Sequence, residues 1–148
     1  MEYQEYQYLI DKAEEQLKRH EGYREKPYRC TAGKLTIGFG RNLSDNGISR
    51  KEAEIMLRED VIAVLRDLEI IFTQKGFKSF PFEVQKTLIN MRYQLGAGGF
   101  RGFKDTISYC KKRLWKHMAY EMRESKWYKK DSPNRAEELA DIVENINE

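Results

Sequence analysis

One stretch, residues 22–47, interrupts a sequence that is otherwise patterned for helices. It holds five of the ten glycines and the β-prone run "KLTIGFG", which together predict short antiparallel strands joined by tight turns. Apolar residues before this stretch recur at helical spacing and predict an amphipathic helix over the first twenty residues: Tyr6, Leu9, Ile10, Ala13 and Leu17. The pattern limits the chain to a mostly α fold with a small sheet near its N-terminus.

A capping box marks the start of the next helix. In "SRKE", Ser49 and Glu52 have the spacing at which the two side chains bond to the free N–H groups of a helix start. The apolar stripe behind them lasts about five turns and predicts a long helix between the sheet and the rest of the chain: Ala53, Met56, Leu57, Val61, Val64, Leu68 and Ile71.

Beyond a break at "KGFKSFP", the sequence is again patterned for helices. The segment "VQKTLINMRYQLG" is apolar on more than one side, as expected of a helix at the centre of a core. One apolar stripe follows from Phe103 to Leu114 and another from Trp115 to Met122, and each predicts a helix. Pro133 suits the first turn of a last helix. Cys110 lies in the first of these stripes, so we expect a small buried side chain with an inert thiol.

The composition excludes several classes of protein. A length of 148 residues suits one domain, and 40% hydrophobic with 34% charged residues is typical of a soluble globular protein. The N-terminus has neither the basic start nor the apolar run of a secretory signal, so we expect synthesis in the cytosol. Two cysteines, Cys30 and Cys110, are too few for a secreted disulfide framework, and both are expected to be thiols.

The net charge of +3 conceals an uneven distribution. Residues 75–135 contain fifteen Lys and Arg residues against five acids: Glu83, Asp105, Glu121, Glu124 and Asp131. Such a region favours a polyanionic partner, for which nucleic acid, anionic lipid and bacterial wall all qualify. The alternative is a solvated, lysine-rich surface without a partner.

Three polar residues near the sheet carry the strongest chemical signal. The stripe of the first helix, extended by one turn, reaches Glu21, which we expect to face a cleft at the helix end. Cys30 follows nine positions later and Thr36 six positions after that, directly before "IGFG".

This order of Glu, Cys and Thr resembles the catalytic signature of phage lysozymes of the T-even type, in glycoside hydrolase family 24. Most members have Asp at the middle position, and a subset has Cys. Three later blocks of this sequence resemble the family in the same order: "NMRYQLG", "GFK" and "SKWYKKDSPNRA". The resemblance covers nearly the whole chain.

The resemblance implies an α+β, mostly α, lysozyme-like fold. The chain would form a single domain, 1–148, with a small β-sheet lobe over about 21–50 and a helical lobe over about 75–148. A long helix would connect the two lobes, and the N-terminal helix would belong to the helical lobe. The protein is expected to be a monomer.

Glycoside hydrolysis needs an acid to protonate the leaving oxygen, and a base or a nucleophile on the opposite face of the sugar. By resemblance, Glu21 is the acid, while Cys30 and Thr36 surround an attacking water, with inversion at the anomeric carbon. A free thiol has a pKa of about 8.5 and is only a few per cent thiolate at pH 7. We therefore expect Cys30 to position water and act as a weak base rather than to form a thioglycoside.

Further positions follow from the resemblance alone. The sites that line the saccharide in the family fall on Asn42, Tyr93, Thr106 and Glu121, of which Tyr93 could equally be a core aromatic. Arg135 corresponds to an arginine near the catalytic glutamate, and Arg41 stands where the family often has His. His20 and His117 lack a nearby set of metal-ligand partners and are expected to be structural or solvated, so no metal is expected. No cofactor is expected either.

The sequence thus predicts an endolysin of muramidase type. It would cleave the β-1,4 bond between N-acetylmuramic acid and N-acetylglucosamine in peptidoglycan and cause host cell lysis. We expect storage in the host bacterial cytoplasm, holin-dependent release to the periplasm and cell wall, no nucleic acid partner and no membrane insertion. Two alternatives stay open: a lytic transglycosylase, and a non-catalytic basic module that binds wall or nucleic acid.

Overall fold

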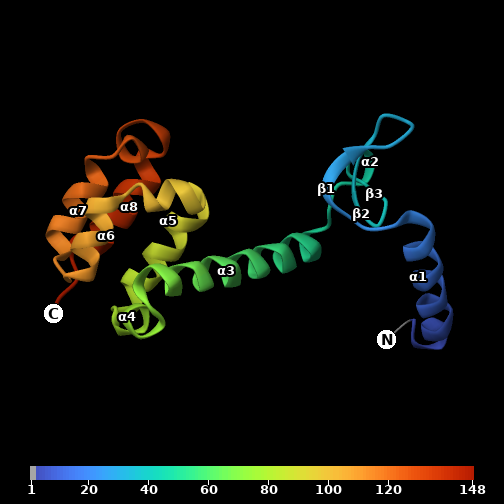
Figure 1. Ribbon diagram of the computed structural model, residues 1–148, viewed down its shortest axis with the longest axis horizontal. Coiled ribbons are helices and arrows are strands. Elements are labelled where there is room, and N and C mark those ends of the chain that lie inside the picture. Colours follow the sequence, from blue (N-terminus) through green and yellow to red (C-terminus); the bar gives the residue numbers. More distant parts are fainter. Residues whose placement is uncertain (1–2) are drawn as a thin grey trace. The chain divides into compact units, whose positions relative to one another are not determined.

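The computed structural model describes residues 3–148 and shows helices with one three-stranded antiparallel sheet (Figure 1). The predicted fold class, α+β and mostly α with a small N-terminal sheet, is confirmed. In chain order the elements are the 3-10 turn η1 (Gln4–Tyr6), α1 (Gln7–Glu21), β1 (Arg24–Arg29), β2 (Leu35–Gly38), β3 (Arg41–Asn42), α2 (Leu43–Asn46), α3 (Arg50–Phe72), α4 (Gln74–Ser79), α5 (Phe82–Arg101), α6 (Lys104–Lys111), α7 (Trp115–Arg123), the π-helical turn η2 (Trp127–Asp131) and α8 (Pro133–Glu144).

The chain divides into two compact units. Unit 1 is Met1–Glu54 and holds α1 and the sheet, and unit 2 is Ile55–Glu148 and holds α4 to α8. The boundary falls within α3, which begins in unit 1 and continues into unit 2. That the whole chain forms one domain, with the N-terminal helix in the helical lobe, stays a prediction.

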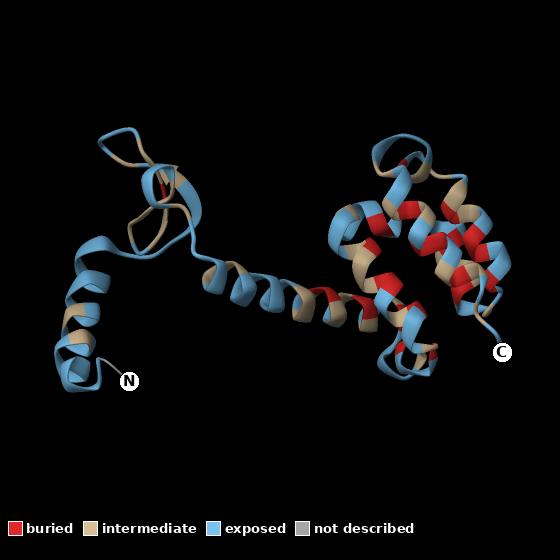
Figure 2. Cartoon of the chain, turned by 180° about the vertical axis from the view of Figure 1, so that it is seen from behind, coloured by how far each residue is buried: buried red, intermediate tan, exposed pale blue. Residues whose placement is uncertain are grey.

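The sheet of unit 1 is built around Thr36. Its strands pair in the order β1-β2-β3, and Thr36 on the central strand lies opposite Tyr28 on one side and Asn42 on the other. Within residues 3–54, Thr36 is the only buried residue, with 4% of its surface exposed (Figure 2). The sheet therefore buries a hydroxyl where an apolar side chain would be usual.

The predicted capping box begins α3 as expected. Ser49 N donates to Glu52 Oε1 at 2.8 Å, and Glu52 N donates to Ser49 Oγ at 3.1 Å. Arg41 of β3 also donates to Glu52, at 3.0 Å, and these bonds lower the pKa of the Glu52 carboxyl to about 2. Glu52 thus ties the sheet to the first turn of α3.

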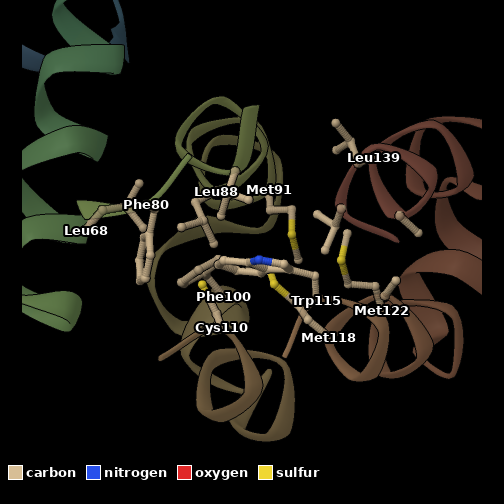
Figure 3. Packing of buried hydrophobic residues seen from close by; sticks show 14 of the residues in the cluster. Leu68, Phe80, Leu88, Met91, Phe100, Cys110, Trp115, Met118, Met122 and Leu139 are labelled. Carbon is tan, nitrogen blue, oxygen red and sulfur yellow. The ribbon is translucent and has the colours of Figure 1, made fainter. Parts of the chain in front are cut away.

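Unit 2 contains the hydrophobic core (Figure 3). The segment predicted to be central lies in α5, where Val84, Leu88 and Met91 are fully buried. They pack with Phe100 of the same helix and with side chains from α3, α4, α6, α7 and α8, among them Leu68, Phe77, Cys110, Met118, Met122 and Ala140. The predicted helical stripes after residue 103 supply most of these contacts.

Two local expectations were wrong. The break predicted around residues 75–81 contains the helix α4, which begins because Thr73 Oγ1 accepts a hydrogen bond from Gly76 N at 3.0 Å. The stripe from Phe103 to Leu114 is not one helix, because α6 ends at Lys111 and Arg113 adopts a positive φ of 59°. Leu114 instead precedes α7 and is 41% exposed.

Within residues 3–148, every helix is too short or too polar to cross a bilayer.

Candidate active site

Glu21 is the last residue of α1, and its carboxylate lies against the turn between β2 and β3. A Cβ atom built on Gly40 would be 2.5 Å from Glu21 Oε2 and 2.8 Å from Glu21 Cδ. Gly40 also has a φ of +74°, which favours glycine. Position 40 therefore has to be a glycine for two reasons, and one of them is the space that the Glu21 carboxylate occupies.

Cys30 and Thr36 lie together in the β1–β2 hairpin. Cys30 N donates to Lys34 O at 3.0 Å, and Gly33 N donates to Cys30 O at 2.8 Å, so Cys30 begins the turn. Thr36 is two residues beyond Lys34, which makes it the diagonal neighbour of Cys30 on the same face. Its hydroxyl donates to Lys34 O at 2.9 Å.

The hairpin backbone favours the thiolate of Cys30. Hydrogen bonds from the backbone amides of Lys34 and Ala32 lower the pKa of the Cys30 thiol below its ordinary value. Burial acts against them, and the Thr36 hydroxyl lowers the pKa of the thiol further. Cys30 is half-buried and free, so a fraction of thiolate above that of an ordinary cysteine can reach a substrate or a water.

Asn42 has a local role in unit 1. Its Oδ1 accepts from Asp45 N at 3.0 Å, and its Nδ2 donates to Asp45 Oδ2 at 2.9 Å. Asn42 is the N-cap of α2, a helix that was not predicted from the sequence. Its predicted contact with saccharide stays a prediction.

The remaining predicted residues belong to unit 2, where Thr106 and Glu121 line one pocket of about 400 Å³. Residues 102–106 form one wall of this pocket, and Glu121, Glu124 and Ser125 form the other. Tyr93 lines a different pocket of about 460 Å³, together with Asp60, Ala63, Val64 and Arg92. Because Tyr93 is 45% exposed, it is not a core aromatic.

Arg135 in the first turn of α8 is bound to α5. Its Nε donates to Asn90 Oδ1 at 2.8 Å. One turn further along α5, Gln94 Oε1 accepts from Trp127 Nε1 at 2.8 Å, and Gln94 Nε2 donates to Ser132 Oγ at 2.7 Å. Asn90 and Gln94 were not predicted from the sequence as residues that anchor α8 and η2. Two amides four residues apart in an apolar segment are the signal that could have found them, because they share one helix face.

The two cysteines differ as predicted. Cys110 is free and fully buried in the core, and its burial raises the pKa of the thiol to about 12. Among residues 3–148, no three His, Cys, Asp or Glu side chains gather in a way that would hold a metal ion.

A mostly helical chain with a three-stranded sheet and this sequence signature falls in the class of lysozyme-like proteins. The profile described as phage lysozyme matches residues 18–142, and the chain belongs to this family. The resemblance inferred from the sequence is thereby confirmed.

Curated relatives agree with this membership at low identity. Two proteins of Dictyostelium discoideum described as probable T4-type lysozymes 2 and 1 are 22% and 23% identical to the chain over 163 aligned positions. Each alignment covers 92% of this chain and 95% of the relative. An endolysin of Acyrthosiphon pisum secondary endosymbiont phage 1 is 44% identical over 52 residues, which is 32% of this chain and 35% of the phage protein.

Proposed function

We propose that the protein is an endolysin that hydrolyses the β-1,4 bond between N-acetylmuramic acid and N-acetylglucosamine with inversion. The observation that carries the proposal is the position of Cys30 and Thr36 as diagonal neighbours on one face of the β1–β2 hairpin, in a chain that matches the phage lysozyme family over residues 18–142. The peptidoglycan substrate follows from that membership.

In this mechanism Glu21 donates a proton to the glycosidic oxygen as the bond to the anomeric carbon breaks. A water molecule held by the Thr36 hydroxyl and Cys30 attacks the opposite face of the sugar. The Cys30 thiolate accepts the proton of that water, so the lowered pKa of the thiol supports its role as a base.

Four residues are proposed to contact the saccharide: Asn42, Tyr93, Thr106 and Glu121. Arg135 is proposed as a supporting residue. The hydrogen bond from Arg135 Nε to Asn90 Oδ1 holds the guanidinium in one orientation on α5.

The biological setting is part of the proposal. The name endolysin of the phage relative supports synthesis in the host cytoplasm and action on the cell wall. Release through a holin and action as a monomer are further parts of the proposal, taken from the resemblance. The excess of positive charge in residues 75–135 would draw the protein to the anionic wall, without nucleic acid as a partner.

The test is hydrolysis of purified peptidoglycan by the wild type and by Glu21→Gln, Cys30→Asp, Cys30→Ser and Cys30→Ala. We expect Glu21→Gln to be nearly inactive, Cys30→Ala to be strongly impaired and Cys30→Asp to keep substantial activity. A fully active Cys30→Ala beside an inactive Cys30→Asp would remove the cysteine from the mechanism.

Product analysis separates the remaining alternatives. NMR of the released sugar should show an inverted anomer, whereas retention would indicate a covalent Cys30 intermediate. Mass spectrometry should find reducing ends, whereas 1,6-anhydro ends would indicate a lytic transglycosylase. Wall binding without any cleavage by the wild type would indicate a binding module.

A further inference from the structure

Lys34, in the β1–β2 hairpin, contacts both residues that are proposed to hold the attacking water. Its carbonyl oxygen accepts from Cys30 N at 3.0 Å and from the Thr36 hydroxyl at 2.9 Å. The hydrogen bond from its amide is the largest of the effects that lower the pKa of the Cys30 thiol. The position of the Lys34 backbone therefore determines how the thiol and the hydroxyl are oriented toward each other.

The tip of the hairpin, residues 31–33, has little support of its own. All three residues are exposed, and Gly33 has a φ of +78°. Arg29 Nη1 donates to Gly33 O at 3.0 Å. Since the tip buries no side chain, the polar contacts at its two ends decide how firmly it keeps its conformation.

The short helix α2 holds the far end of this turn. Lys34 Nζ donates to Asp45 Oδ1 at 3.0 Å. Leu35 N, one residue further on, donates to Ser44 Oγ at 2.9 Å. The second oxygen of the Asp45 carboxylate accepts from Asn42 Nδ2 at 2.9 Å. Two consecutive residues at the start of β2 are thus attached to α2, and Asp45 is itself held in place.

The ion pair between Lys34 and Asp45 serves local geometry more than overall stability. The two side chains are 45% and 51% exposed, and pairs this exposed contribute little to the stability of a folded protein. The ammonium and the carbonyl oxygen belong to one residue, however, so the pair restrains the backbone to which Cys30 and Thr36 bind.

We propose that Lys34 is a positioning residue for Cys30 and Thr36, and that its ion pair with Asp45 of α2 fixes the backbone on which both depend. The inference rests on the proposed function, because it assigns a role within the same site. Lys34 touches no substrate in this role. It acts through the direction of the thiol and the hydroxyl that hold the water.

The first test measures the Cys30 thiol without any substrate. Alkylation by iodoacetamide is followed as a function of pH in the wild type, Lys34→Met and Asp45→Asn, with peptide mass spectrometry to select Cys30. At pH 7 we expect both variants to react about two- to fivefold more slowly, because a displaced Lys34 amide stabilises the thiolate less.

The sign of the two effects separates positioning from direct electrostatics. Lys34→Met removes a positive charge and Asp45→Asn removes a negative one, so charge alone would change the thiolate in opposite directions. Positioning predicts the same direction for both. The double variant should then react like either single variant, since each already breaks the pair.

Two further variants serve as controls. Lys34→Arg can keep the ion pair and should react like the wild type. Lys26→Met removes a lysine from the neighbouring strand β1 that forms no ion pair within residues 3–148, and it should also react like the wild type. Melting temperatures should agree among all variants. Opposite changes in Lys34→Met and Asp45→Asn, or an equal effect of Lys26→Met, would overturn the inference.

The second test measures hydrolysis of soluble peptidoglycan fragments by the same proteins. We expect kcat to fall about two- to fivefold in Lys34→Met and in Asp45→Asn, with KM unchanged and with kcat restored in Lys34→Arg. A higher KM with unchanged kcat would overturn the inference, because Lys34 would then contact the substrate.

The two tests together distinguish this inference from the proposed function. Unchanged kcat and unchanged thiol reactivity in both variants, beside an active wild type, would overturn the inference and leave the proposed function intact. The expected thiol reactivities in a chain that cleaves no peptidoglycan would support positioning by Lys34 and overturn the proposed function.

Discussion

At the scale of single residues, the backbone conformation of Gly40 bears directly on the position of Glu21, the proposed catalytic acid. Its positive φ and its missing side chain together leave room for the Glu21 carboxylate. Gly38, two residues earlier, has a similar φ of +67°, yet a Cβ atom there would meet nothing within 4 Å. The two glycines share one backbone requirement and differ in their contact with Glu21.

This difference predicts unequal effects of alanine. Gly40→Ala and Gly38→Ala should each destabilise the protein by about 1–2 kcal/mol, because alanine resists a positive φ. Gly40→Ala should also move the Glu21 carboxylate and lower wall hydrolysis by about tenfold or more relative to Gly38→Ala. Melting curves and turbidity assays would measure both effects. Equal activities would argue against a catalytic Glu21 at this position.

The two thiols should differ in reactivity. Cys30 is half-buried with a lowered thiol pKa, and Cys110 is buried with its thiol pKa raised to about 12. Iodoacetamide at pH 7 should therefore modify Cys30 alone in the native protein, and both residues after denaturation. Peptide mass spectrometry gives the sites. Modification of both cysteines, or of neither, in the native state would contradict the structure of the hairpin or of the core.

At the scale of elements, Asp67 joins α3 to α5 within unit 2. Its Oδ2 accepts from Arg92 Nε at 2.7 Å and from Arg101 Nη1 at 2.8 Å. The two guanidinium groups lower the pKa of the Asp67 carboxyl to about 2, and the larger effect comes from the hydrogen bond of Arg101. Arg101 stands beyond Gly96, whose φ of +76° bends α5. Asp67 therefore fixes both parts of the bent helix to α3.

The lowered pKa sets a pH window for this contribution. A carboxyl whose pKa is depressed by folding stabilises the protein above its unfolded pKa of about 3.9, and the effect is lost as the pH falls toward 2. Asp67→Asn should cost about 1 kcal/mol at pH 7, after allowance for solvent screening, and little near pH 2. Urea unfolding at several pH values would measure this.

Glu69→Gln is the control for that experiment, because Glu69 lies on the same helix and forms no ion pair within residues 3–148. Its effect should be small at every pH. A cost of Asp67→Asn that does not change between pH 7 and pH 2 would mean that the carboxylate acts by shape rather than by charge.

At the scale of the whole molecule, positive charge is concentrated in one part of the sequence. The chain carries +3 overall, while residues 75–135 have fifteen basic residues against five acids. Long-range attraction to the wall should therefore depend on this part more than on the net charge. Salt at 0.1 M screens such attraction beyond about 10 Å.

Two double variants with the same net charge test this distribution. Lys111→Glu with Lys112→Glu alters the basic stretch, and Lys26→Glu with Lys51→Glu alters unit 1 at equally exposed positions. Co-sedimentation of Glu21→Gln versions with purified wall at low salt should fall more for the first pair, and the difference should vanish at high salt. Equal losses of wall binding in the two double variants would show that binding depends on the net charge alone and not on where the charge lies.

The sequence alone determined most of the elements and the three residues of the signature. Helical periodicity, the Ser49–Glu52 cap and the hairpin glycines act over a few residues, so a single sequence displays them. The burial of Cys110 followed from its place in an apolar stripe. The short helices α2 and α4 were not predicted, because each depends on one capping side chain rather than on a repeated pattern of apolar residues.

Only the tertiary structure decided which distant residues meet. Arg135 reaches Asn90 across 45 residues, Trp127 reaches Gln94 across 33, and Thr106 and Glu121 share a pocket from two helices. These contacts depend on how helix faces pack, and many pairings of the same faces are compatible with one periodicity. For the same reason the Glu21 carboxylate could be assigned to a helix end from the sequence, while its place against Gly40 required the folded chain.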